Sequence, residues 1–162
     1  MLIDHPAVEI AWATSRRPAP IEEFHPTLYG NGIRLIHPDD TSECDVVFMA
    51  LPTAPSVGVA EQFIETGAKV IDFGSAFRLN DTDTWERVYK MPHPSWSLAE
   101  KTVCGLSELH HDEIAGARLI ANPGCFSCAS IPGLAPMIVA GLVDPQHLSV
   151  GQDEQRGRPH GG

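Results

Sequence analysis

Basic residues are scarce in this chain, which has 11 lysines and arginines against 21 aspartates and glutamates, a formal net charge of −10. Proteins that bind nucleic acid neutralise phosphates with clustered lysines and arginines, so the composition argues against nucleic acid as a partner. A small anionic substrate is still compatible with this charge, because a single local arginine can hold a phosphate in an acidic protein.

Long apolar runs are also absent. No run approaches the roughly 18 residues of a membrane span, so we expect no membrane partner. The first residues lack the basic start and apolar stretch of a secretory signal, and we therefore expect a cytoplasmic protein. Hydrophobic residues make up 43% of the chain and charged residues 20%, which is typical of a soluble globular domain.

Cysteines are too few for a disulfide scaffold, since only four occur in 162 residues. Cys44 and Cys104 are expected to be core thiols. Cys125 and Cys128 form a C-x-x-C, a spacing found in redox pairs and in half of a zinc site. No second pair and no suitably spaced histidines complete a metal site, and the aromatic residue that precedes a thioredoxin-type pair is missing. We expect no metal.

Segments typical of strands and of helices alternate along the chain. Apolar runs predict strands over residues 8–14, 33–36, 45–51, 69–73, 118–121 and 147–150. Helical patterns cover residues 56–67, 83–89, 107–115 and 125–141, with Ser107 as a cap and residues 91–96 as a loop. This alternation predicts an α/β fold with a doubly wound parallel sheet.

A glycine-rich turn of the form G-x-G-x-x-G is missing before Val8. Dinucleotide-binding domains hold the pyrophosphate with such a turn, between their first strand and the helix that follows. Residues 1–6 have the pattern of the last turn of a helix. We therefore expect a Rossmann-like domain that lacks its first strand and Gly-rich turn.

Cys125 stands where a predicted strand gives way to a predicted helix, in the sequence Asn122-Pro123-Gly124-Cys125. The positive end of a helix dipole stabilises a thiolate over a thiol, and a thiolate attacks carbonyl carbon. Ligands in doubly wound folds bind at the ends of the strands. Taken alone, a buried structural cysteine is the competing interpretation.

Two arginine-containing turns also follow predicted strands. Gly74–Leu79 comes after the strand KVIDF, so Arg78 is in place to bind a phosphate or carboxylate with both arms of its guanidinium. Ser15 and Arg16 follow VEIAWAT, where an arginine suits the 2′-phosphate of NADP. Solvent-exposed arginines are the alternative at both positions.

Three longer segments carry a family resemblance. DVVFMALP, KVIDFGSAFRLND and GLSELHHDEIAGARLIANPGC, in this order, resemble the N-acetyl-gamma-glutamyl-phosphate reductases of arginine biosynthesis, from about residue 1 to 150. The resemblance implies a partial NADP-binding domain over residues 1–124 and the start of a second, α+β domain over residues 125–150. It implies the following roles: Cys125 as the nucleophile, Arg78, Ser75 and Asn122 at the substrate, Ser15 and Arg16 at the cofactor's ribose phosphate, and Leu51 and Pro52 beside the nicotinamide.

The activity implied is the reduction of an acyl phosphate with NADPH. A cysteine thiolate displaces phosphate to give a thioester, and hydride converts the thioester to N-acetylglutamate semialdehyde. The partner implied is a small acyl phosphate, and the full-length relative is expected to form a homo-oligomer. The lysine-pathway aminoadipyl-phosphate reductase and aspartate-semialdehyde dehydrogenase remain as alternatives. A further alternative, of another class, is an inactive truncated product.

The chain departs from the family pattern in several places. Phe126, Ser127 and Cys128 replace the usual Tyr, Pro and Thr, which puts a second, oxidisable thiol beside the nucleophile. No histidine lies in a matching motif, so we assign no catalytic base and expect no measurable reductase activity from residues 1–162 alone. Residues 151–162 contain nothing apolar, and we expect an unstructured tail. Reading their codons one nucleotide later permits the family's S-G-A-G-R segment, which would make the tail a frameshift.

Overall fold

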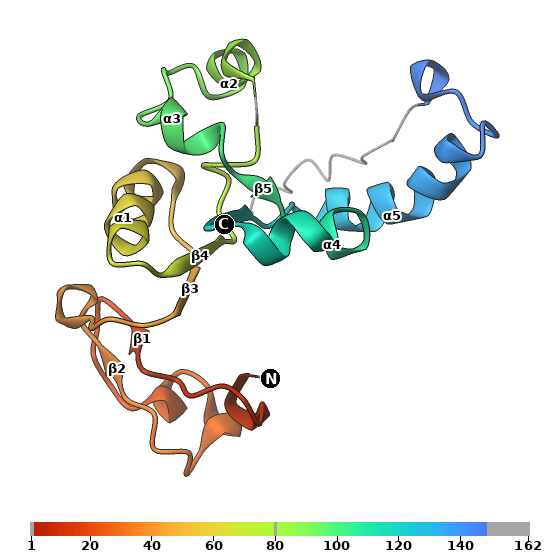
Figure 1. Cartoon of the computed structure of the whole chain (residues 1–162). Helices are drawn as coiled ribbons and strands as arrows, with labels where there is room; N and C mark the ends of the chain where they lie inside the picture. Colours follow the sequence, from red (N-terminus) through yellow and green to blue (C-terminus); the bar gives the residue numbers. More distant parts are fainter. Residues whose placement is uncertain (1, 80, 149–162) are drawn as a thin grey trace, which may run out of the picture.

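The computed structural model describes residues 2–79 and 81–148, and its centre is a four-stranded parallel sheet (Figure 1). The strand order is β3-β4-β6-β5. The strands are β3 (Val46–Met49), β4 (Lys69–Asp72), β5 (Val103–Cys104) and β6 (Leu119–Ala121). Because all the pairs are parallel, the carboxyl ends of the strands lie along one edge of the sheet.

Helices pack against both faces of this sheet, although Val46 and Phe48 on one face of β3 are exposed. From α1 (Thr53–Glu65), Val57 and Ala60 join the buried core formed with Val47 and Val70 on one face. Lys69 precedes Val70 in β4, so its side chain points to the opposite face. There its Nζ donates to the carbonyl of Ala115, at the end of α4 (Ser107–Gly116), at 3.0 Å. The doubly wound α/β prediction is thereby confirmed.

Three further helices complete the described chain. They are α2 (Thr82–Tyr89), α3 (Trp96–Ala99) and α5 (Cys125–Val139). Short 3₁₀ turns occur at Leu2–Asp4, Ile21–Glu23, Pro26–Leu28, Pro38–Asp40 and Pro145–His147. In the part of the chain that the structure describes, no helix meets the length and apolarity that crossing a membrane requires.

A separate two-stranded parallel sheet pairs β1 (Ala13–Thr14) with β2 (Leu35–Ile36). It forms the orange lobe at the bottom of Figure 1. Trp12 connects this lobe to the main sheet, because its ring stacks on Phe63 of α1 at 5.6 Å between centroids. Its indole Nε1 also donates to the carbonyl of Ser42 at 2.9 Å.

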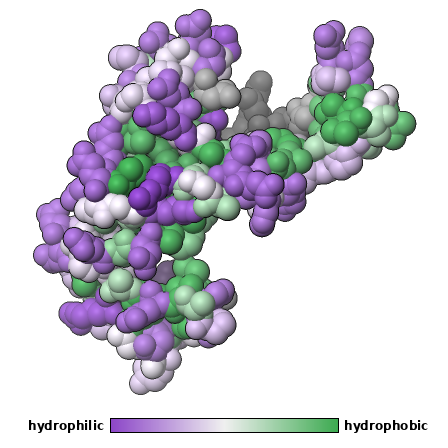
Figure 2. Space-filling model, in the orientation of Figure 1, coloured by the Kyte–Doolittle hydropathy of each residue, from purple (hydrophilic) through white to green (hydrophobic). Residues whose placement is uncertain are grey.

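The α5 helix extends away from the sheet and none of its residues is buried (Figure 1). It continues without interruption through Pro132 and Pro136, although a proline inside a helix removes a backbone hydrogen bond. Apolar side chains at Met137, Val139 and, beyond the helix, Leu142 remain exposed, and green surface marks this arm at the right of Figure 2.

Most predicted elements are confirmed to within a few residues at their ends. The strand predicted over residues 8–14 is too long, since only Ala13–Thr14 pair and β2 offers no further partner. The predicted loop over residues 91–96 ends in a helix, because α3 begins at Trp96. Strand β5 was not predicted, since two residues are too few to show a pattern.

Three smaller predictions are wrong. Ser107 is the first residue of α4 and not its cap, and its hydroxyl donates to Glu108 at 3.3 Å. Cys104 is exposed at the end of a short edge strand, whereas Cys44 packs against the core as expected. His147 belongs to a 3₁₀ turn and not to a strand. The remainder of that predicted strand and the tail, residues 149–162, lie outside the described residues.

Candidate active site

Loops from three neighbouring strands meet at the carboxyl edge of the main sheet. Leu51 and Pro52 follow β3, residues 74–78 follow β4, and residues 122–125 follow β6. The order β3-β4-β6 puts the β4 loop between the other two. Ligands of doubly wound sheets bind at this edge, so the topology brings together the residues that the sequence singled out after these strands.

Arg78 joins the β4 loop to the β6 loop. Its Nε donates to the carbonyl of Asn122 at 3.0 Å, and its Nη2 donates to the carbonyl of Phe73 at 2.8 Å. Its Nη1 lies 3.1 Å from the position that a Cβ atom on Gly124 would take. A permanent positive charge is therefore fixed beside the residue that precedes Cys125.

Cys125 is the first residue of α5, and Gly124 is its N-cap. The first turn closes when the backbone N–H of Cys128 donates to the carbonyl of Gly124 at 2.9 Å. This turn contains no acidic residue, and the thiol of Cys125 is exposed. The thiol therefore stands at the positive end of the helix dipole, one residue after the glycine that the Arg78 guanidinium approaches.

Asp72, the last residue of β4, is fully buried beneath the same loops. Its Oδ1 accepts from the N–H of Gly74 at 2.9 Å, and its carbonyl accepts from the N–H of Asn122 at 2.8 Å. Within the described residues its Oδ2 has no hydrogen-bond partner. Burial raises the pKa of this carboxyl above its usual value, while the Gly74 N–H and the charge of Arg78 act in the opposite direction.

Ser75 is held from two sides. Its hydroxyl lies 2.9 Å from the hydroxyl of Thr53, the first residue of α1. Its carbonyl accepts from the phenol of Tyr89 at 3.3 Å. The next carbonyl, that of Ala76, lies 2.9 Å from Nε2 of His93. These contacts fix the course of the chain from the end of β4 to Arg78.

Trp85 packs against the two side chains that hold the β4 loop, Tyr89 and His93. Its fully buried ring stacks on Tyr89 with 4.0 Å between centroids and meets the edge of His93 at 4.5 Å. Tyr89 and His93 are the two side chains that reach the carbonyls of Ser75 and Ala76, so α2 and the loop after it position the β4 loop.

Leu51 and Pro52 lie at the exposed end of β3. The hydroxyl of Ser56 donates to both of their carbonyls, at 3.2 and 2.8 Å. Gly74 approaches the same segment so closely that a Cβ atom on it would stand 2.8 Å from the carbonyl oxygen of Leu51. At Gly74 the β3 and β4 loops therefore approach each other backbone to backbone.

Ser15 and Arg16 follow β1 of the separate two-stranded sheet, and within the described residues no hydrogen bond or ion pair joins them to the other candidate residues. The N–H of Ser15 donates to the carbonyl of Ile36 at 2.9 Å. Arg17 is engaged by Glu23 at 3.4 Å and lies over the ring of Phe24. Arg16 is exposed, and within the described ranges no ion pair or hydrogen bond is found for its side chain.

The sequence singled out Arg78 and Cys125 but overlooked Asp72, Thr53 and His93. An aspartate inside the otherwise apolar run KVIDF was the available signal for a buried carboxylate. Nothing in the local sequence indicated that His93 contacts the β4 loop, because that contact depends on how α2 packs. Among the described residues, no group of three metal-binding side chains is found.

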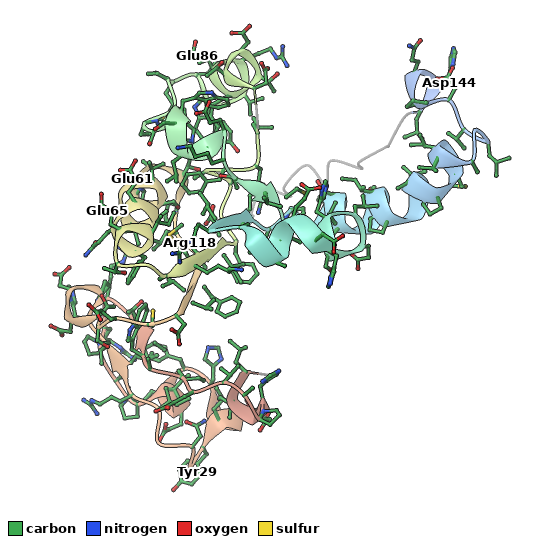
Figure 3. The ribbon with its side chains drawn as sticks, in the orientation of Figure 1. Tyr29, Glu61, Glu65, Glu86, Arg118 and Asp144 are labelled. Carbon is green, nitrogen blue, oxygen red and sulfur yellow. The ribbon has the colours of Figure 1, made fainter. Side chains whose placement is uncertain are left out.

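An open hollow lies at the opposite, amino-terminal edge of the sheet. It has a volume of about 560 Å³ and is lined by residues that include Cys44, Lys69 and Arg118. Arg118, which stands just before β6 near the centre of Figure 3, donates to the carbonyl of Gly67. Since ligands of this architecture bind at the carboxyl edge, we place the chemistry there and not in this hollow.

Gly74→Ala tests the close approach of the β3 and β4 loops. The added methyl would stand 2.8 Å from the Leu51 carbonyl oxygen and 2.9 Å from Asp72 Oδ1, so we expect a loss of about 1–3 kcal/mol in the free energy of unfolding. Gly58→Ala, in α1 where nothing lies within 4 Å, is the matched control and should gain about 0.5–1 kcal/mol. Urea denaturation measures both, and equal effects of the two substitutions would contradict the geometry.

Asp72 predicts a pH dependence of stability. A raised pKa means that the folded state binds this proton more tightly than the unfolded chain does. Stability relative to Asp72→Asn should therefore be greatest below the ordinary aspartate pKa of about 3.9 and should fall as pH rises through the raised pKa of Asp72.

Asp81 provides a control, because its contribution to stability should change with pH in the opposite direction. The side chain and N–H of Thr84 lower the pKa of Asp81, so its contribution is lost as pH falls through that lowered pKa. Denaturation midpoints measured over a pH series for wild type, Asp72→Asn and Asp81→Asn separate the two effects. If wild type instead became more stable relative to Asp72→Asn as pH rises, the assignment would be refuted.

Comparison with known proteins shows the family of the chain. Residues 1–117 match the family model described as semialdehyde dehydrogenase, NAD binding domain. The chain is 39% identical over 153 residues to an N-acetyl-gamma-glutamyl-phosphate reductase of Herminiimonas arsenicoxydans, covering 91% of this chain and 44% of that protein. A relative with the same name from Neisseria meningitidis serogroup C, serotype 2a, is 42% identical over 144 residues, which are 85% of this chain and 41% of the relative.

Among solved structures, an aspartate semialdehyde dehydrogenase II of Vibrio cholerae aligns with a TM-score of 0.49 and 19% identity, over 67% of this chain and 31% of that one. The chain spans less than half the length of the curated relatives named above. The family model covers well over half of the chain, up to the strand that leads to Asn122 and Cys125. The chain belongs to the semialdehyde dehydrogenase family, whose NAD-binding-domain model it matches over residues 1–117.

Proposed function

We propose that this chain takes part in the reduction of N-acetyl-gamma-glutamyl phosphate to N-acetylglutamate semialdehyde, with Cys125 as the nucleophile. The relatives to which it is similar are named N-acetyl-gamma-glutamyl-phosphate reductase. Because the chain spans less than half of their length, the proposal concerns the longer enzyme. The observation that carries it is the Arg78 guanidinium, held by two backbone carbonyls beside the start of α5.

In the first chemical step, Cys125 would attack the acyl carbon and Arg78 would bind the phosphate that leaves. The thiolate of Cys125 attacks the acyl carbon, the new carbon–sulfur bond forms, and the bond from carbon to the phosphate oxygen breaks with release of phosphate. Within the described residues no hydrogen bond occupies Nη1 of Arg78, so this nitrogen is free to hold the phosphate as it leaves. Ser75 and Asn122 flank the same space and complete the proposed substrate site.

The nicotinamide cofactor belongs to the same edge of the sheet. Leu51 and Pro52 are exposed at the end of β3, next to the β4 loop, and would border the nicotinamide ring. When bound, a reduced nicotinamide supplies the hydride that turns the thioester into an aldehyde. The chain's own part is to present Cys125, to hold the loops and to keep a cation at the phosphate.

NADP is the form of the cofactor that we propose. Arg17 is already engaged by Glu23 and Phe24, whereas no partner of Arg16 is found in the described part of the chain. Arg16 is therefore the cation available to a ribose 2′-phosphate, and the Ser15 hydroxyl shapes its turn by accepting from the N–H of Arg17 at 3.1 Å.

Two wider proposals concern the longer enzyme. We place the start of a second domain at Cys125, since α5 has no buried residue and the family model ends at residue 117. We also propose a cytoplasmic location and a homo-oligomer for the longer enzyme. All four cysteines are free, which suits a reducing compartment, and the apolar residues of α5 suit a covered surface.

Acylation without cofactor tests the function. The reduced chain, mixed with N-acetyl-gamma-glutamyl phosphate, should release one phosphate per chain and gain the N-acetylglutamyl group in the tryptic peptide 119–156, from which hydroxylamine should remove it. Cys125→Ala should abolish both signals, and Cys128→Ser should keep them. Arg78→Met should slow the release of phosphate by about 10²-fold, because a fixed donor to the leaving group is lost.

Two results would overturn the proposal. The first is acylation of Cys104, in the separate tryptic peptide 102–118, at the same rate as Cys125. The second is faster acylation by aspartyl phosphate or by the aminoadipyl phosphate of the lysine pathway, which would keep Cys125 as the nucleophile but replace the substrate.

A further inference from the structure

Two thiols occupy the first turn of α5. Cys125 begins the helix and Cys128 follows three residues later, at helical phi and psi closed by the bond from Cys128 N–H to the Gly124 carbonyl. Helix geometry, with a rise of about 1.5 Å per residue and a radius of about 2.3 Å, separates such Cα atoms by roughly 5 Å. This separation falls inside the range of about 4.4–6.8 Å that a disulfide requires.

The side chains are also favourably directed. Helical side chains tilt toward the helix N-terminus, and Sγ of Cys128 lies 3.6 Å from the carbonyl oxygen of Pro123, two residues before Cys125. Cys128 therefore points back over the turn on which Cys125 stands. Both thiols are exposed, so their side chains can rotate. Cβ atoms three residues apart on a helix are about 5–6 Å apart, against about 3.5–4.5 Å in a disulfide, so closing the bond also requires a small adjustment of the first turn of α5.

The surroundings favour oxidation at Cys125. The helix N-terminus and the Arg78 guanidinium, whose Nη1 lies 3.1 Å from the position of a Cβ on Gly124, both stabilise negative charge. The first turn has no acidic residue to oppose this. Thiolates at exposed, electropositive positions are the cysteines that hydroperoxides oxidise, above all where a second thiol stands nearby.

We propose that Cys125 and Cys128 form a reversible disulfide when the protein meets a hydroperoxide. The Cys125 thiolate attacks the terminal oxygen of the peroxide, a sulfur–oxygen bond forms as the oxygen–oxygen bond breaks, and the departing hydroxide of hydrogen peroxide is protonated to water (an organic hydroperoxide would release an alcohol instead). Cys125 is now a sulfenic acid. The Cys128 thiolate attacks its sulfur, the disulfide forms, the sulfur–oxygen bond breaks, and a second water leaves.

The disulfide would remove the nucleophile from use and protect it. A sulfenic acid without a neighbouring thiol proceeds to sulfinic and sulfonic acids, which a dithiol does not reverse, whereas the disulfide is restored by thiol exchange. Cys104, on β5, and Cys44, against the core, stand on other elements and do not share this turn. The proposal depends on the placement of the two thiols and not on the acyl-phosphate activity.

Peptide mapping after peroxide treatment tests it. Trypsin leaves both cysteines in the peptide 119–156, apart from Cys104 in 102–118 and Cys44 in 35–69. One equivalent of hydrogen peroxide should remove two hydrogens from peptide 119–156, and dithiothreitol should restore the original mass and the labelling of Cys125. In Cys128→Ser the loss of two hydrogens should disappear, and oxygen should accumulate on Cys125 in a form that dithiothreitol does not fully reverse.

Cys104→Ser is the matched control and should keep the disulfide. Circular dichroism of each variant shows whether the fold is retained, and Cys128→Ala provides a second replacement of the same thiol. A preferred link between peptides 119–156 and 102–118, or an unchanged mass of 119–156 while Cys125 is oxidised, would overturn the proposal. The acylation test uses reduced protein, so the two proposals fail independently.

Discussion

The guanidinium of Arg78 is the interaction on which the arrangement of the site depends. It donates to the carbonyls of Phe73 and Asn122, which directly follow the neighbouring strands β4 and β6, and it adds a charge next to Gly124. Arginine is the side chain that combines a planar fork of N–H donors with a permanent positive charge. The same contact therefore fixes two loops and sets the electrostatics at Cys125.

The parallel sheet makes this contact available. Because β4 lies between β3 and β6, the loops after these strands can meet over one buried aspartate, Asp72. Asp72 binds the N–H of Gly74 with its side chain and that of Asn122 with its carbonyl. The absence of a side chain on Gly74 lets the β3 loop approach, and α2 supports the β4 loop from beneath through Tyr89.

The sequence predicted the elements with the strongest patterns and missed what tertiary packing decides. Apolar runs such as VVFM were identified as strands because buried parallel strands need apolar residues on both faces, although Val46 and Phe48 on one face of β3 are exposed in the structure. The run VEIAWAT is also largely apolar but pairs at only two residues, since strand formation also needs a partner. Cys125 and Arg78 could be predicted from their places after strands, whereas the role of His93 depends on the packing of Trp85 and could not.

Alkylation rates measured at each cysteine test most directly whether Arg78 and the helix N-terminus activate Cys125. With reduced protein and iodoacetamide near neutral pH, Cys125 should react faster than Cys104, although both are exposed. Arg78→Met should slow Cys125 and leave Cys104 unchanged. Faster labelling of Cys104 in the wild type, or a Cys125 rate that does not respond to the loss of Arg78, would contradict the account.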